Sequence, residues 1–231
     1  VRQYPLHVTS SLPEPTPIPT IEVIATGKAE LVRSFIQREG EKNKRTHCLS
    51  VGTPEGIHYS LDLNRGSILQ FWKGGFANVT EMWYERGEPQ ILHPMGSAIL
   101  TAGQTDFAVL TDLNTAWPDS SVDLSFKGYR LNPAGIPTLT YRTRNGDITD
   151  EIAPENGGLM RTITASNLPN TYVRLVAGKS ISLLEKGLYE IDGQRYYVRI
   201  DPKSKPVVRT VKGQQELLLP LTGSLHYSLI W

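Results

Sequence analysis

The chain has 231 residues, of which 39% are apolar and 20% are charged, and this balance is typical of a folded globular protein. Lys and Arg number 24 against 23 for Asp and Glu, so no overall charge favours nucleic acid or an anionic membrane, and we expect no nucleic-acid partner. The single cysteine, Cys48, excludes an intramolecular disulfide, a Cys-based zinc or iron–sulfur site and covalently bound c-type haem, and no apolar run approaches the roughly 20 residues of a membrane span.

The N-terminal segment is rich in proline. Residues 11–20 read SLPEPTPIPT, with four prolines in ten positions. Proline lacks a backbone donor and favours extended polyproline II geometry, so we expect residues 1–20 to form an extended arm or linker. Residues 21–231 are expected to form a single β-sandwich domain. The chain begins at Val1 without a visible signal peptide, which fits either a processed exported protein or a piece of a longer one.

Beyond residue 21 the turn signals recur about every 8–12 residues, which is the spacing of a β-sandwich or barrel. In residues 57–63, apolar residues alternate with His58, Ser60 and Asp62, as in a half-buried strand. The sequence therefore predicts an all-β fold, a large antiparallel β-sandwich or supersandwich with an extended Pro-rich N-terminal arm. Strands are expected at 21–23, 30–36, 47–51, 57–63, 67–72, 79–84, 98–100, 126–131, 138–143, 171–175, 189–191, 195–200, 216–219 and 225–231.

Three turns carry hairpin signals. Asn64-Arg65-Gly66 is expected to join strand 57–63 to its neighbour, and Asn145-Gly146 and Asp192-Gly193 are dipeptides that favour tight turns between antiparallel strands. These pairs of strands are therefore expected to be neighbours in the sheet.

Residues able to perform catalysis form no recognised motif. No pair of the five histidines has the spacing of a local metal site, so we expect no metal and no cofactor. Cys48 lies in an apolar run and is expected to be buried, while Arg161 and Arg174 are expected on outward faces. A pair of carboxylates about 5–10 Å apart could serve glycosidic chemistry, and the carboxylates to examine are Asp62, Glu81, Glu85, Asp147, Asp150 and Glu151.

Aromatic residues give the stronger indication of a binding site. Five of them lie in or beside glycine-rich bends: Trp72, Phe76, Trp83, Tyr84 and Trp117. An exposed ring there could stack on a sugar while a nearby Arg or Asp hydrogen-bonds its hydroxyls. The alternative is that the tryptophans pack in the core, which is their commoner role. The candidate ligand-binding residues are Trp72, Trp83, Tyr84, Arg65, Arg86 and Asp62.

The run VGTPEGIHYSLDLNRGSILQFWKGGFANVTEMWYERGEP, residues 51–89, resembles an uncharacterised exported bacterial all-β domain. That domain has the pattern VG-x-P-x-G…FD…R…L…W-x-G-x-F-x-D-x-T…W…RG, and residues 126–154 and 157–165 resemble its continuation. The similarity covers about residues 30–231. Asn78 departs from the pattern, which commonly has Asp there.

Domains of this kind accompany c-type cytochrome, quinoprotein sugar dehydrogenase-like or sugar-hydrolase-like modules in secreted proteins of Bacteroidetes- and Planctomycetes-type bacteria. The resemblance implies a periplasmic or extracellular location and a link to carbohydrate or electron-transfer chemistry. It supplies no catalytic residues.

Three functions follow as hypotheses. The first is a non-catalytic exported interaction or accessory domain of a larger cell-envelope assembly, with other envelope proteins, c-type cytochromes among them, as partners. The second is a carbohydrate-binding module that uses the candidate residues named above. The third is a sugar-active enzyme of β-sandwich type, which needs two carboxylates, or a histidine and a carboxylate, facing one cleft.

Overall fold

Antiparallel strands dominate the computed structural model, which describes residues 17–84, 90–120, 123–166 and 168–231. Strands make up 56% of the described residues and helix 2%. The expectation of an all-β, sandwich-like fold is therefore confirmed. Most of the expected Pro-rich arm, residues 1–16, lies outside the described residues.

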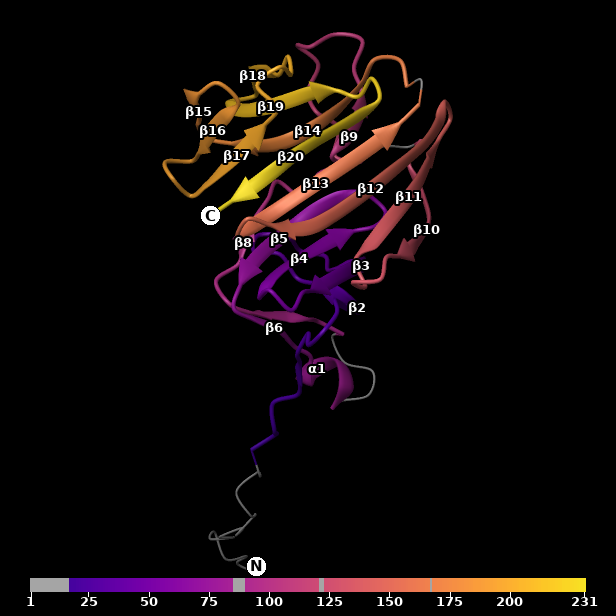
Figure 1. Cartoon of the computed structure of the whole chain (residues 1–231), viewed down its shortest axis with the longest axis vertical. Coiled ribbons are helices and arrows are strands. Elements are labelled where there is room, and N and C mark those ends of the chain that lie inside the picture. Colours follow the sequence, from indigo (N-terminus) through magenta and orange to yellow (C-terminus); the bar gives the residue numbers. More distant parts are fainter. Residues whose placement is uncertain (1–16, 85–89, 121–122, 167) are drawn as a thin grey trace, which may run out of the picture.

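Four sheets form the body (Figure 1). The largest has eight strands, in the order β10 (Ser125–Leu131), β11 (Pro137–Thr143), β12 (Gly146–Glu155), β13 (Gly158–Ala165), β20 (Ser224–Ile230), β17 (Tyr196–Ile200), β16 (Leu188–Ile191) and β15 (Ile181–Glu185). The five-stranded sheet, purple in Figure 1, has β2 (Glu30–Ile36), β3 (Arg45–Gly52), β4 (Ile57–Asp62), β5 (Ser67–Lys73) and β8 (Ile99–Leu100).

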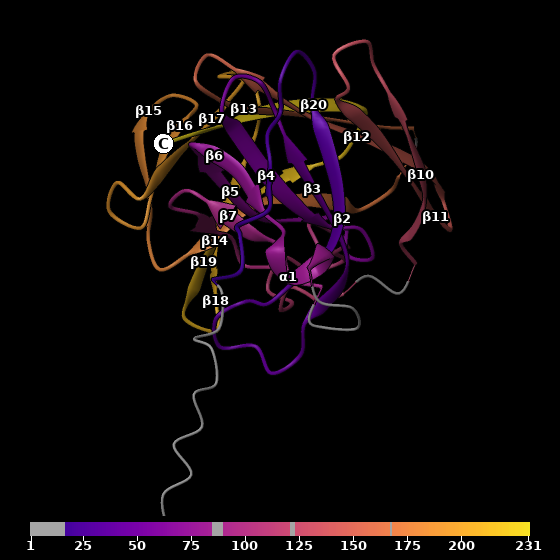
Figure 2. The same cartoon turned by 90° about the horizontal axis from the view of Figure 1, so that it is seen from below.

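Two smaller sheets complete the fold. One has the order β18 (Val207–Val211), β19 (Gln214–Pro220), β14 (Thr171–Gly178) and β9 (Phe107–Val109), and the other β1 (Glu22–Val23), β6 (Gly75–Asn78) and β7 (His93–Met95). A single helical turn among the described residues, α1 (Thr80–Trp83), follows β6. Figure 2, seen from below, places α1 near the middle of the lower end, with strands of the larger sheets around it.

The main core lies between the inner faces of the three larger sheets. Each of the three sheets contributes fully buried residues to this cluster: Leu49 and Tyr59 from the five-stranded sheet, Tyr141 and Ile163 from the eight-stranded sheet, and Leu217 from the four-stranded sheet. One cluster thus joins strands from both halves of the chain, and its burial is the principal force that holds the sheets together.

The three hairpin expectations are confirmed. Residues on either side of Asn64-Arg65-Gly66 pair as β4 and β5, and β11 and β12 meet at a two-residue tip formed by Arg144 and Asn145. β16 and β17 likewise pair across Asp192-Gly193.

Strand β4 is buried on both faces, so the expectation of a half-buried strand is wrong. Every residue of β4 is buried. One face meets the main core. On the other face, the His58 ring lies 5.5 Å from the Trp72 ring and 5.3 Å from the Phe76 ring, both of which belong to a second apolar cluster. Polar residues on this covered face bond one another, as Ser50 Oγ and Ser60 Oγ do at 2.8 Å.

The expected strand at residues 79–84 is also wrong, because the chain turns into α1 there. Asn78 Oδ1 accepts hydrogen bonds from the backbone N–H of Thr80 at 3.0 Å and from its hydroxyl at 2.6 Å. Such local side-chain bonds bend the backbone away from a ladder. The residue that departs from the family-like pattern, Asn78, thus starts the helical turn.

Candidate functional site

A charged network crosses the interior where the sheets meet. Arg161 on β13 is 1% exposed, and its guanidinium bonds both carboxylate oxygens of Asp150 on β12, at 2.9 and 2.8 Å. The same group bonds Asp106 at 2.6 Å, the Tyr227 hydroxyl at 3.1 Å and the Gly66 carbonyl at 3.1 Å. Burial raises the pKa of Asp106, against the opposing pull of Arg161.

A second buried charged cluster is formed by residues of the four-stranded sheet itself. Glu216 is held by Arg174 at 2.9 Å and by Arg209 at 2.7 Å. Both guanidiniums lie over the ring of Trp117, at 5.0 and 5.9 Å from its centroid. Trp117 is only 6% exposed, so this ring packs against cations and presents no face to a ligand.

The expectation that Arg161 and Arg174 face outward is wrong. Arg161 shares its strand face with Leu159 and Ile163, two residues away on either side, and all three are buried. Asp150 shares a face with Ile148 and Ile152 in the same way. The alternation of each strand thus indicated that Arg161 and Asp150 are buried, because a charged residue two positions from apolar residues on both sides shares their inward face.

The carboxylates considered for glycosidic chemistry do not converge on one cleft. Asp150 pairs with buried Arg161, and Asp62 pairs with Arg45 at 3.1 Å. Asp147 pairs with Arg142 on the exposed side of the sheet, and Glu81 on α1 pairs with His93. Each of these four described carboxylates has its own basic partner on a different element, so they form no acid–base pair. Glu85 lies outside the described residues.

Three of the six candidate sugar-binding residues, Trp72, Asp62 and Arg65, make structural contacts within the protein. Trp72 is 0% exposed, its indole N–H bonds the carbonyls of Gly75 and Phe76, and its ring packs on Phe76. The proposal that it stacks on a ligand is therefore wrong, and the core alternative holds. Asp62 is 4% exposed and accepts the backbone N–H of Asn64.

Arg65 is engaged at the same turn. Its guanidinium lies 3.6 Å from Asp62, 3.0 Å from the Asp119 carboxylate and 3.4 Å from the Gly103 carbonyl. These contacts tie the β4–β5 turn to the following segment, so Arg65 is not available for a ligand. Arg86, the remaining cation of the set, lies outside the described residues.

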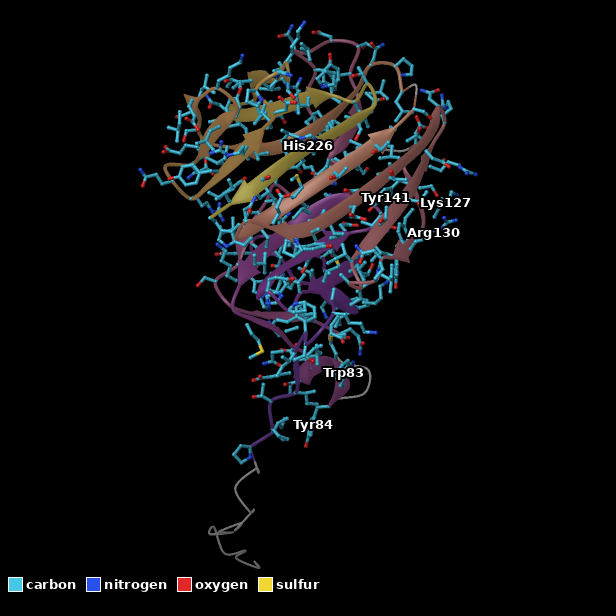
Figure 3. The ribbon with its side chains drawn as sticks, viewed as in Figure 1. Trp83, Tyr84, Lys127, Arg130, Tyr141 and His226 are labelled. Atoms are coloured by element: carbon cyan, nitrogen blue, oxygen red, sulfur yellow. The ribbon has the colours of Figure 1, made fainter. Side chains whose placement is uncertain are left out.

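The other two candidates form an exposed aromatic surface, which we call the aromatic pole. Trp83 is 58% exposed and Tyr84 is 53% exposed, and both lie at the lower end of the molecule beside α1 (Figure 3). They are neighbours in sequence and point away from the core. These are the residues of the candidate set that the structure leaves accessible.

The backbone beneath the aromatic pole is firmly anchored. Val79, just before α1, is 0% exposed, and its N–H bonds the Ile21 carbonyl at 2.9 Å. The Ile21 N–H in turn bonds the Thr80 hydroxyl at 2.9 Å, and Met82 packs on the second apolar cluster. The short helical turn is therefore held to the sheet, while its last residue, Trp83, and the following Tyr84 remain in solvent.

His58 is a structural residue. It is 2% exposed, its Nδ1 accepts the Thr53 N–H at 3.1 Å, and its Nε2 lies 2.8 Å from the Gly74 carbonyl, which fixes the neutral form with the proton on Nε2. Burial lowers its pKa. No group of three or more metal-ligating side chains occurs among the described residues, and no helix among them is long and apolar enough to cross a membrane.

No protein-family model matches the chain, and no curated protein matches it.

Proposed function

We propose that the chain is a non-catalytic interaction or accessory module of an exported assembly, and that the aromatic pole is its contact surface. The observation that carries this proposal is the exposure of Trp83 and Tyr84, 58% and 53%, on an anchored backbone. Exposed patches of large apolar side chains mark interaction sites, and Trp and Tyr dominate the energetics of protein interfaces.

The size of the aromatic pole is sufficient for a pair of energetic hot spots. A Trp or Tyr side chain buries about 150–250 Å² when fully covered, so covering the exposed half of each ring removes about 100 Å² from water. At about 25 cal/mol per Å², each ring contributes about 2–3 kcal/mol to binding, which is the range of an interface hot spot. The anchored backbone lowers the ordering cost that a mobile loop would add.

The partner proposed is another envelope protein, with c-type cytochromes as one class. Two features support it: the similarity to exported domains that accompany such modules, and the position of the aromatic pole at the end of the body where residues 17–20 lie (Figures 1 and 3). A module joined to other domains through that segment would present Trp83 and Tyr84 toward them.

Site-specific photo-crosslinking tests the proposal. A benzophenone side chain at Tyr84, introduced into the protein in its native host, should yield one discrete protein adduct on irradiation. The matched control is the same group at Tyr129, which is 40% exposed on β10. Equal adducts from both positions, or no adduct from position 84, would contradict the proposal.

A further inference from the structure

A second surface lies on the outward side of the eight-stranded sheet, far along the chain from the aromatic pole. Outward side chains of β12, β13 and β20 stand in register there. Thr149, Thr164 and Ser224 form one row across the strands. The next two rows, each two residues further along, are Glu151, Thr162 and His226, then Ala153, Met160 and Ser228. We call these nine residues the open face.

Strand geometry sets the dimensions of the open face. Neighbouring strands lie about 4.8 Å apart, and outward residues of one strand recur about every 6.7 Å. The middle row continues onto β11 and β10 through Thr138 and Arg130, so five polar side chains cross about 19 Å of sheet. His226 and Arg130 mark the two ends of this row in Figure 3.

The chemistry of the open face is mainly that of hydroxyl groups. Its nine side chains include five hydroxyls and one carboxylate, Glu151, which accepts a hydrogen bond from Thr138. Exposed sheet faces normally carry more charge than this. The long charged side chains stand at its margins instead, among them Arg130 on β10, Arg142 on β11 and Arg199 on β17, each of them exposed.

This composition indicates which classes of ligand the open face can bind. The described residues of β11, β12, β13 and β20 include no large hydrophobic side chain that is exposed, so the open face lacks the apolar anchors that a protein partner needs. Its near-neutral charge likewise gives no attraction to a polyanion or a polycation. A flat array of groups that both donate and accept hydrogen bonds complements an uncharged polyhydroxylated ligand.

We propose that the open face binds an uncharged polysaccharide, whose hydroxyls bond the Thr and Ser side chains row by row. This goes beyond the protein contact at the aromatic pole and does not depend on it. It also places carbohydrate binding on residues other than Trp72, Arg65 and Asp62, whose side chains bond other groups of the protein.

Affinity electrophoresis through gels that contain laminarin, galactomannan or dextran tests the proposal, with polygalacturonate as the charged comparison. The unaltered chain should be retarded by at least one neutral polysaccharide. Replacing Thr162 and Thr164 together by Val keeps the shape and β-propensity of both residues but removes two hydroxyls. At about 0.5–1.5 kcal/mol for each lost bond, the affinity should fall about tenfold.

Two controls make each outcome decisive. Thr210→Val removes an exposed hydroxyl from β18 in another sheet and should leave the retardation unchanged. Trp83→Ala with Tyr84→Ala should also leave it unchanged. The proposal is overturned by retardation in polygalacturonate alone, by no retardation in any neutral gel, or by retardation that the aromatic variants abolish and the Thr162 and Thr164 variant does not.

Discussion

The interior charge network makes the sharpest prediction about stability. Asp150→Asn keeps the size of the side chain but removes its charge, and so leaves the buried Arg161 with Asp106 as its remaining anionic partner. Removing one partner from a buried ion pair costs about 3–5 kcal/mol, because the other charge stays in a poorly solvating interior. Since Asp106 still bonds Arg161, we expect a loss near the lower end, about 3 kcal/mol.

That loss is large against the total stability of a domain, which is about 5–15 kcal/mol. Urea denaturation followed by tryptophan fluorescence should therefore show a clear fall in the midpoint with little change in slope. Asp147→Asn is the matched control, because it makes the same change three residues earlier on β12. Its ion pair with Arg142 is exposed, with side chains 62% and 44% accessible, so the loss should stay below about 1 kcal/mol. Equal losses in the two variants would refute the reasoning.

Three further predictions concern single residues. Burial lowers the pKa of His58, so below about pH 6.5 the imidazole binds a proton in the unfolded chain but not in the folded chain, and the free energy of unfolding should fall from pH 7 to pH 5. His58→Gln should remove this contribution to the pH dependence, measured from denaturation curves at the two pH values. The same pH dependence in the variant would contradict the neutral, hydrogen-bonded histidine. Cys48 is 1% exposed, and burial raises its pKa to about 12. The native protein should therefore resist alkylation by iodoacetamide at about pH 8 and react only after unfolding. Rapid labelling of the native protein would disprove the burial of Cys48. Gly146, the first residue of β12, has φ 153°, and an added Cβ would lie 3.2 Å from the Ser166 carbonyl oxygen. Gly146→Val should therefore cost about 1–3 kcal/mol in chemical denaturation, and no loss would refute the strain assigned to this backbone position.

The sequence predicted the local structure well because local structure depends on neighbouring residues. Alternation in residues 57–63 and the dipeptide Asn145-Gly146 each carry a physical requirement that a strand or a tight turn satisfies. The same patterns do not say what covers a strand. On the second face of β4, His58 packs against Trp72 from the neighbouring strand β5 and against Phe76 from β6, which belongs to the small three-stranded sheet.

The candidate site was predicted less well for the same reason. Trp72 and Trp83 lie eleven positions apart in similar glycine-rich sequence, and one is fully buried while the other is more than half exposed. Trp72 lies on β5 and packs on Phe76, whereas Trp83 lies at the end of α1, after the turn in which Asn78 accepts the Thr80 N–H. The open face was also out of reach of sequence reasoning, because its rows depend on the register between β13 and the distant β20.

We propose that the protein acts by contact through the aromatic pole, and this is tested most directly on the partner itself. The most direct measurement is the affinity of the partner captured at position 84, determined by calorimetry for the unaltered chain and for the variant with Trp83→Ala and Tyr84→Ala. Two rings worth about 2–3 kcal/mol each predict a loss of about 1,000-fold or more. Leu184→Ala, at an exposed residue on β15, is the control and should leave the affinity unchanged. Equal affinity of the unaltered chain and the double variant would contradict the account.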